Sequence, residues 1–208
     1  MYVRQFMISQ VFTVNPEQTV VDVMALMREK RIRRVPVVEK GKLVGLLTDG
    51  DLREISPSPA TTLSVWELNN LIAKITVRDV AKKKVVTCPP DMRLEDAALL
   101  MMDRKISGLP VVDEGKLVGI ITLVEITRAF LDVMGSRSPG ERVVIETKDK
   151  VGVISDLGIA TKEHDVNIAS LAVFHREENK VQILVHLQGD NAAEVETSLE
   201  KKGYRIRK

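Results

Sequence analysis

The sequence has little of what several common protein classes depend on. It contains a single cysteine in 208 residues, which excludes an intramolecular disulfide and a cysteine-rich zinc site and fits a reducing compartment. No apolar run approaches the roughly 20 residues that span a bilayer, and residues 1–10 lack the apolar stretch of a signal peptide. We therefore expect a soluble, cytoplasmic protein.

Aromatic residues and net charge are also low. Aromatics make up 3% of the chain, so platforms for base stacking are scarce. The 31 basic and 29 acidic side chains leave a formal charge of +2, which disfavours a broad nucleic-acid-binding surface. Apolar residues reach 44%, enough for one large or two modest domains. These proportions predict a folded protein with an aliphatic core rather than a disordered chain.

The first two thirds of the chain is an internal duplication. Residues 3–54 align without gaps with residues 77–128 at an offset of 74, and 18 of the 52 aligned positions are identical. Each copy is predicted to fold as strand, helix, strand, strand, helix. The sheet of one copy is too short to bury both of its faces alone. We therefore expect the two copies to pack against each other about a pseudo-twofold axis.

The pattern of the first copy predicts its elements. Residues 11–14 are predicted as a short strand that ends at Asn15-Pro16. Thr19 and Asp22 are candidate caps of the helix that follows. Residues 35–38 and 43–47 are apolar runs joined by a turn that contains Gly41, which predicts a hairpin. A second helix is predicted to begin near Asp49.

The segment between the copies, residues 56–75, is predicted to be a linker and a leading helix. Residues 56–62 are rich in proline, serine and threonine, which favours a turn. Residues 64–72 then have the pattern of a helix. It holds Trp66, the only tryptophan, which we expect to fill the seam between the copies rather than to contact a ligand.

The composition changes at residues 135–140, where a second domain is predicted to begin. Its predicted order is β-α-β-β-α-β, the ferredoxin-like split arrangement, so the fold class is α+β. The predicted strands cover residues 142–147, 167–175, 181–187 and 204–207, and the predicted helices cover residues 153–163 and 192–202.

The motifs of both parts resemble known families. The repeated unit resembles a CBS domain through VRQFM and VRDVA, VPVV and LPVV, and GLLTDGD and GIITLVE; a pair of such units is called a Bateman module. The tail resembles an ACT domain through DKVGVISDLG and DVNIASL. Together they resemble the acetoin-utilization B-type (AcuB-like) proteins. The resemblance implies CBS domains at residues 1–55 and 76–134 and an ACT-like domain at residues 140–208.

The resemblance to CBS pairs implies a ligand that contains adenosine, such as AMP, ADP, ATP or S-adenosylmethionine, bound between the copies. The ribose motif of the family is matched by Gly45, Thr48 and Asp51, where a carboxylate accepts hydrogen bonds from the 2′ and 3′ hydroxyls. The same spacing also fits a helix N-cap without any ligand. In the second copy Thr122 and Glu125 form a capping-box pattern with glutamate in place of aspartate, so capping is the first interpretation there and nucleotide binding the second.

A basic run precedes the central strand of the first copy. Residues 28–34 hold five basic side chains and one acid. By the resemblance, Arg33 and Arg34 would bind the phosphates of the nucleotide, for which paired hydrogen bonds suit arginine. The alternative is a solvated helix end. The equivalent residues of the second copy are Ser107 and Gly108, so we expect one competent nucleotide site, mainly on motifs of the first copy.

In the tail, the resemblance to ACT domains implies a ligand such as an amino acid between paired domains, near the loop after the first strand and the start of the second. The matching residues are Asp149, Gly152, Asn167 and Ile168. The alternative is that these residues only form a dimer interface or a turn. In either case a homodimer is expected.

No residue pattern predicts catalysis or metal binding. The three histidines, His164, His175 and His186, have an even spacing of 11 that does not suit a metal site; we expect His175 and His186 on different strands, facing solvent or a partner. Cys88 aligns with Val14 and is predicted to be a packing residue. We therefore predict a protein that is not an enzyme and requires no cofactor beyond the nucleotide as a regulatory ligand.

Three functions fit these patterns. The first is a regulator that senses a nucleotide and a small metabolite, acts on an enzyme through rearrangement of a dimer, and is linked to acetoin metabolism by resemblance alone. The second is a structural pairing module without ligand. The third is a nucleic-acid-associated regulator that uses residues 28–34; it is the weakest, and no contact with a membrane is expected.

Overall fold

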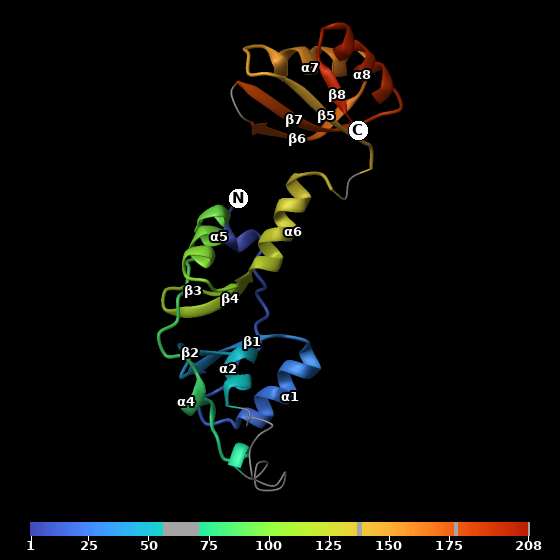
Figure 1. The fold of residues 1–208 in the computed structure, drawn as a ribbon. Coiled ribbons are helices and arrows are strands. Elements are labelled where there is room, and N and C mark those ends of the chain that lie inside the picture. The colour runs from blue at the N-terminus through green and yellow to red at the C-terminus, as the bar shows by residue number, and fades with distance from the viewer. Residues whose placement is uncertain (56–70, 137–138, 177–178, 208) are drawn as a thin grey trace. The chain divides into compact units, whose positions relative to one another are not determined.

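The computed structural model describes residues 1–55, 71–136, 139–176 and 179–207. It divides into two compact units, Met1–Ile126 and Thr127–Lys208, each of which is described by itself (Figure 1). The predicted turn at residues 56–62 and Trp66 lie outside the described residues. Within the described part of the chain, no helix combines the length and the apolar character needed to cross a membrane.

The first unit contains both repeats. Its elements, in chain order, are η1 (Val3–Gln5), α1 (Val20–Lys30), β1 (Arg34–Glu39), β2 (Lys42–Thr48), α2 (Asp49–Glu54), α4 (Val77–Val80), α5 (Leu94–Asp103), β3 (Gly108–Asp113), β4 (Lys116–Thr122) and the start of α6 (Leu123–Val133). The predicted helices at Val20 and Asp49 are confirmed, and Thr19 and Asp22 form a capping box.

The four strands of this unit form one sheet in the order β1-β2-β4-β3. Each repeat contributes an antiparallel hairpin, and the two hairpins meet at the pair Lys42 and Lys116. Read from either edge, the sheet has the first strand of a repeat outside and its second strand inside, as expected for two repeats related by a pseudo-twofold axis. The hairpin turn at Gly41 has a φ of 78°, which explains the glycine at that position.

The leading segments of the two repeats are exchanged. The amide of Val3 donates to the carbonyl of Met92 at 3.0 Å, so the chain start packs on the second repeat. Conversely, the amide of Val77 donates to the carbonyl of Gln18 at 2.9 Å, and Lys82 pairs with Leu46. Each repeat is therefore completed by the start of the other.

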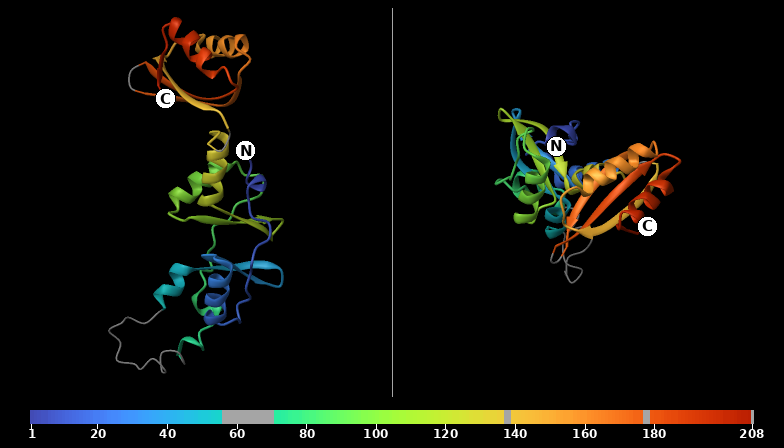
Figure 2. Two further views of the ribbon diagram at one scale, coloured as in Figure 1. Left: turned by 90° about the vertical axis from the view of Figure 1, so that its right-hand side faces the viewer. Right: turned by 90° about the horizontal axis from the view of Figure 1, so that it is seen from above.

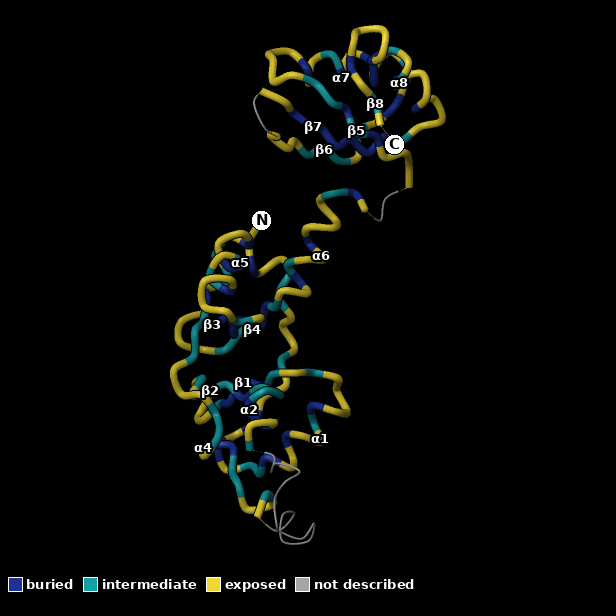
Figure 3. The backbone as a smooth tube through the Cα atoms, in the orientation of Figure 1, coloured by how far each residue is buried: buried dark blue, intermediate teal, exposed yellow. Residues whose placement is uncertain are grey.

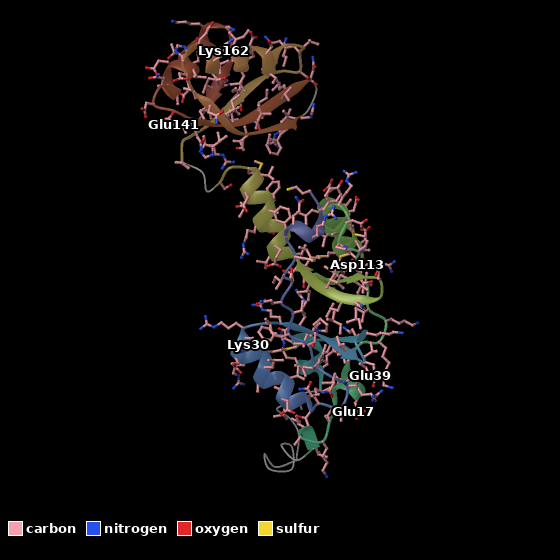
Figure 4. The ribbon with its side chains drawn as sticks, turned by 180° about the vertical axis from the view of Figure 1, so that it is seen from behind. Glu17, Lys30, Glu39, Asp113, Glu141 and Lys162 are labelled. Carbon is pink, nitrogen blue, oxygen red and sulfur yellow. The ribbon has the colours of Figure 1, made fainter. Side chains whose placement is uncertain are left out.

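An ion-pair network holds the exchanged segment 77–82 to the first repeat. The Nη2 atom of Arg78 lies 2.6 Å from Oε1 of Glu17 and 3.0 Å from Oε1 of Glu39. Figure 4 shows Glu17 and Glu39 close together at the same end of this unit. All three side chains are exposed, so the network orients the segment more than it stabilises the fold.

The predicted strand at residues 11–14 is wrong in extent. Only Val14 pairs, in a parallel bridge to Val37, where it accepts from Val38 and donates to Pro36. The next rung of a parallel ladder would need an N–H at Pro36, which proline lacks. Cys88 pairs with Val111 beside Pro110 in the same way.

The core of the first repeat is aliphatic, as the composition predicts. It includes Val77, a residue of the exchanged segment, and so joins the two repeats through apolar contact. Its buried members are Val14, Val20, Val23, Met27, Val35, Val37, Leu47, Leu52 and Val77.

The second unit has the predicted β-α-β-β-α-β order. Its elements are β5 (Glu141–Lys148), α7 (Val153–Glu163), β6 (Asn167–His175), β7 (Lys180–Gln188), α8 (Ala192–Lys201) and β8 (Arg205–Arg207). The sheet is antiparallel with the order β6-β7-β5-β8, and α7 and α8 cover one of its faces (Figures 1 and 2). Figure 3 shows buried stretches along β5 and β7, the two inner strands, whose side chains Val143, Ile145, Ile183 and Val185 contribute to the core.

Candidate functional site

A cavity of about 550 Å³ in the first unit is lined by residues of both repeats. The first repeat contributes the start of β1, the end of β2 and the start of α2. The second repeat contributes Lys82 of the exchanged segment, residues 84–86 after it, the end of α5 and the starts of β3 and α6. The lining residues are Arg34, Leu46, Thr48, Asp49, Gly50, Lys82, Lys84, Val85, Val86, Met101, Met102, Lys105, Ile106, Ser107, Gly108 and Leu123.

Thr48 and Asp51 lie where β2 ends and α2 begins. The Thr48 amide and Oγ1 donate to Oδ2 of Asp51 at 2.8 and 2.5 Å, and the Asp51 amide donates back to Thr48 Oγ1 at 3.3 Å. The capping box considered in the sequence is therefore present. The Asp51 side chain is only 5% exposed, and its second oxygen, Oδ1, is directed to a lysine.

That lysine is Lys82, which belongs to the exchanged segment. Its Nζ lies 2.7 Å from Oδ1 of Asp51, and its own side chain is 67% exposed. Burial alone would raise the pKa of Asp51, but hydrogen bonds from Lys82 and Thr48 outweigh burial and hold the pKa below its usual value. The hydrogen bond and the charge of Asp51 raise the pKa of Lys82. The pair is thus ionised at neutral pH.

Arg34 crosses from the first repeat to the second. Its Nη2 donates to Oγ of Ser107 at 2.5 Å, and its guanidinium covers Gly108, where an added Cβ would lie 2.7 Å from Nη1. Ser107 and Gly108 are the repeat equivalents of Arg33 and of Arg34 itself, so Arg34 lies at the pseudo-twofold axis. Burial lowers the pKa of Arg34, and the carboxylates of Asp49 and Glu125 act in the opposite direction.

The cavity combines an apolar wall with a cationic rim. Four cations line it, namely Arg34, Lys82, Lys84 and Lys105, against one lining carboxylate, Asp49, whose Oδ2 pairs with Arg53 at 2.6 Å. Apolar side chains, Leu46, Val85, Val86, Met101 and Ile106 among them, supply the rest of the lining. The arrangement suits a ligand with a flat apolar end and an anionic end.

The remaining residues of the predicted nucleotide site lie elsewhere. Arg33 is exposed and is not among the lining residues, although its carbonyl accepts from the Asp49 amide at 2.9 Å. Thr122 also lies outside the cavity lining. Its Oγ1 donates to Glu125, a buried residue, in the capping arrangement predicted for the second copy.

Lys82 is the site residue that the sequence analysis missed. The triplet Lys82-Lys83-Lys84 is a second basic run and could have drawn attention to this segment. Its proximity to Asp51, however, depends on the exchange of leading segments, which no local pattern indicates.

The tail residues of the predicted ligand site do not meet within one chain. β5 and β6 are both antiparallel to β7, so they run in the same direction. Asp149 and Gly152, after β5, therefore lie at the end of β6, and Oδ2 of Asp149 is 3.6 Å from Nε2 of His175. Asn167 and Ile168 lie at the start of β6, where Asn167 pairs with Gln188.

The groups considered for other chemistry are separated. His175 is on β6 and His186 on β7, as predicted, but His186 is buried, because the backbones of Gly135 and Gly140 lie against its ring. Burial raises the pKa of Cys88 to about 11, in agreement with a packing role. Among the residues that the structure describes, no group of histidine, cysteine, aspartate and glutamate is arranged to hold a metal ion.

Sequence comparison matches the repeats to one family. The profile described as "CBS domain" matches residues 3–58 and 77–132, more than half of the chain. The CBS domain-containing protein YhcV of Bacillus subtilis is 35% identical over 138 residues, which are 66% of this chain and 89% of that protein. Inosine-5′-monophosphate dehydrogenase of Aquifex aeolicus is 32% identical over 163 residues, 74% of this chain but only 31% of the enzyme.

Solved structures give the same assignment for the first unit. A putative acetoin utilization protein (AcuB) from Vibrio cholerae has a TM-score of 0.56 and 27% identity, covering 68% of this chain and 98% of that chain. CBSX2, a protein of Arabidopsis thaliana, in complex with AMP has a TM-score of 0.54 and 32% identity, covering 64% and 97%. The CBS domain pair of MJ0100, in complex with 5′-methylthioadenosine and S-adenosyl-L-methionine, has a TM-score of 0.52 and 26% identity, covering 62% and 95%.

Proposed function

The chain belongs to the CBS-domain family, and we propose that it is a non-catalytic sensor that binds an adenosine nucleotide in the cavity between its two CBS repeats. One observation carries this proposal. The buried carboxylate of Asp51 adjoins a cavity whose rim is cationic and whose wall is apolar. A nucleotide presents the complementary groups: a diol, phosphates and a flat base.

Each part of the nucleotide has a matching group in the cavity lining or, for Asp51, directly beside it. Asp51 accepts hydrogen bonds from the ribose hydroxyls, and Thr48 holds the carboxylate in position. The guanidinium of Arg34 binds phosphate by paired hydrogen bonds. The AMP complex of CBSX2 and the S-adenosyl-L-methionine complex of MJ0100 support an adenosine ligand for a CBS pair.

The second repeat is proposed to lack an equivalent site. Thr122 binds Glu125 as Thr48 binds Asp51, but the glutamate side chain is one methylene longer. At the positions equivalent to Lys82 and Lys84 the first repeat has Ile8 and Gln10, which carry no charge. By the same equivalence, the lining residues Met102, Lys105 and Ser107 correspond to Arg28, Arg31 and Arg33, so a site at Thr122 would take its cations from residues 28–34.

The tail is proposed to be an ACT-like domain that pairs with a second copy through β6. This strand is an edge of its sheet, and Leu171, Val173 and Phe174 on it are exposed. Two β6 edges paired antiparallel would bring the end of one strand beside the start of the other. That pairing joins the Asp149–Gly152 loop to Asn167 and Ile168 across two copies, where a small metabolite such as an amino acid would bind.

The test of nucleotide binding is calorimetric titration of the full chain with AMP, ADP, ATP and S-adenosylmethionine. Asp51→Ala should weaken binding by at least tenfold. Asp22→Ala is a matched control, because it removes the equivalent capping box from α1, a helix with no residue in the cavity lining. Unchanged affinity in Asp51→Ala would contradict the role of Asp51, and no binding at millimolar ligand would contradict nucleotide binding and favour a structural pairing module.

Three further experiments test the remaining proposals and alternatives. Salt-dependent DNA binding would favour the nucleic-acid-associated regulator that uses residues 28–34. Light scattering of the full chain tests the homodimer, which a monomer at all concentrations would contradict. A link to acetoin metabolism is supported by the likeness to AcuB, and recovery of an enzyme of that metabolism with the tagged chain from its native cells would test it.

A further inference from the structure

Both oxygens of the ribose carboxylate in the proposed site have partners before any ligand arrives. Oδ2 of Asp51 accepts two hydrogen bonds from Thr48, and Oδ1 pairs with Nζ of Lys82 at 2.7 Å. A ribose diol brings two hydroxyl donors to this carboxylate, of whose roughly four acceptor positions one is unused. Since Thr48 is part of the helix cap, Lys82 is the partner that can yield the second position.

The side chain of Lys82 can move while its backbone stays in place. Its backbone is fixed by two hydrogen bonds with Leu46, each of 3.0 Å, in which the amide of each residue donates to the carbonyl of the other. Its side chain is 67% exposed and lines the cavity. The ammonium can therefore leave Asp51 and remain inside the same cavity.

The consequence of this release depends on the charge of the ligand. An anionic phosphate gives the freed ammonium a new partner, and the new ion pair offsets the loss of the ion pair with Asp51. A neutral nucleoside offers no such partner. S-adenosylmethionine carries a carboxylate, but its sulfonium and ammonium groups outweigh it and bring net positive charge to a rim that already holds Arg34, Lys84 and Lys105.

We propose, on the premise that the cavity binds adenosine ligands, that Lys82 makes the site selective for phosphorylated nucleotides over neutral nucleosides and over S-adenosylmethionine. Lys82 transfers from Asp51 to the phosphates when a nucleotide binds. It therefore sets which class of adenosine ligand the CBS pair senses, and the selectivity resides in a residue that the second repeat donates to the first.

The test compares four ligands on the wild-type full chain and on three variants of it. Adenosine, AMP, ADP and S-adenosylmethionine are titrated by calorimetry into wild type, Lys82→Met and Lys83→Met. Lys83 is a matched control: it is the neighbouring exposed lysine and does not line this cavity. Lys82→Arg serves as a conservative rescue, because it keeps the charge.

In Lys82→Met we expect adenosine to bind about fivefold more tightly, because no Lys82–Asp51 ion pair has to be broken. We expect ADP to bind about fivefold more weakly, because the ion pair between Lys82 and phosphate is lost. Each factor corresponds to one partly exposed ion pair. The ratio of ADP to adenosine affinity then falls by about 25-fold, whereas Lys83→Met and Lys82→Arg keep the wild-type ratio. A ratio within twofold of wild type in Lys82→Met overturns the selectivity role while the proposed nucleotide binding stands. Failure of all four ligands to bind wild type overturns both.

Discussion

Replacement of Gly108 by alanine should displace the guanidinium of Arg34 without disturbing the fold around it. The added Cβ would lie 2.7 Å from Nη1, 3.0 Å from Cζ and 3.1 Å from Cδ of Arg34. Ordinary contacts are about 3.5 Å, so the side chain must shift by roughly 0.8 Å. The clash falls on the far end of a flexible side chain, which moves more readily than strand β3.

The two consequences of this shift differ in size. Stability should change by no more than about 1 kcal/mol, because water replaces the Arg34–Ser107 hydrogen bond and alanine in a strand regains about 0.5–1 kcal/mol relative to glycine. A displaced guanidinium loses its paired hydrogen bonds to phosphate, and each charge-assisted bond contributes about 1.5–3 kcal/mol. Loss of one such bond corresponds to a decrease of roughly 10- to 150-fold in affinity for ADP.

The assay pairs urea unfolding with calorimetric titration of ADP and adenosine. Gly158→Ala is the control, because no atom lies within 4 Å of the added Cβ in α7. We expect the affinity for ADP to fall in Gly108→Ala alone, with that for adenosine nearly unchanged. Wild-type affinity for ADP in Gly108→Ala would refute the role of Arg34, and a loss of stability above about 3 kcal/mol would refute the reasoning from side-chain flexibility.

Three further outcomes follow from the geometry. The pKa of Asp51 lies below its usual 3.8, so the stabilising effect of the ionised carboxylate is complete well above pH 3.8 and is lost as the pH falls through the lowered pKa. The difference in unfolding free energy between wild type and Asp51→Asn should therefore shrink from about pH 7 to about pH 3. A constant difference would contradict this expectation. Gly152 has a φ of 98°, so Gly152→Ala should cost about 1 kcal/mol in urea unfolding even though no atom lies near its Cβ, whereas an unchanged midpoint would exclude strain there. Burial raises the pKa of Cys88 to about 11, so Ellman's reagent at pH 8 should label the thiol only in urea, and rapid labelling of the native protein would argue against its burial.

The elements of the fold were predictable because each repeat combines turn residues with strong apolar patterns. In the tail, helix α7 has the predicted bounds and the strands differ from prediction by one residue at most. The failure at residues 11–14 has a local cause, since Pro36 removes the hydrogen bond that a longer ladder requires. The burial of His186 was not predictable, because it depends on Gly135 and Gly140, which precede it by some fifty positions in the chain.

The site was only partly predictable for a similar reason. The motif residues Thr48, Asp51 and Arg34 stand out in one copy and meet at one cavity or beside it. Lys82 reaches Asp51 only because the start of each repeat completes the other, and sequence spacing carries no sign of this exchange. The separation of Asp149 from Asn167 likewise follows from strand direction, which appears only once the sheet order is known.

The asymmetry between the repeats has a steric cause at the axis that relates them. Arg34 and Gly108 occupy equivalent positions and contact each other, and the guanidinium of Arg34 fills the space that a side chain at position 108 would need. Two arginines at these positions would place like charges in the same volume, which is unfavourable for both packing and charge. One repeat carries the arginine, and glycine at the equivalent position of the other leaves room for that arginine to reach Ser107. A duplicated module with a single central cation therefore has two different clefts, and the difference between Asp51 and Glu125 is a second asymmetry of the same pair.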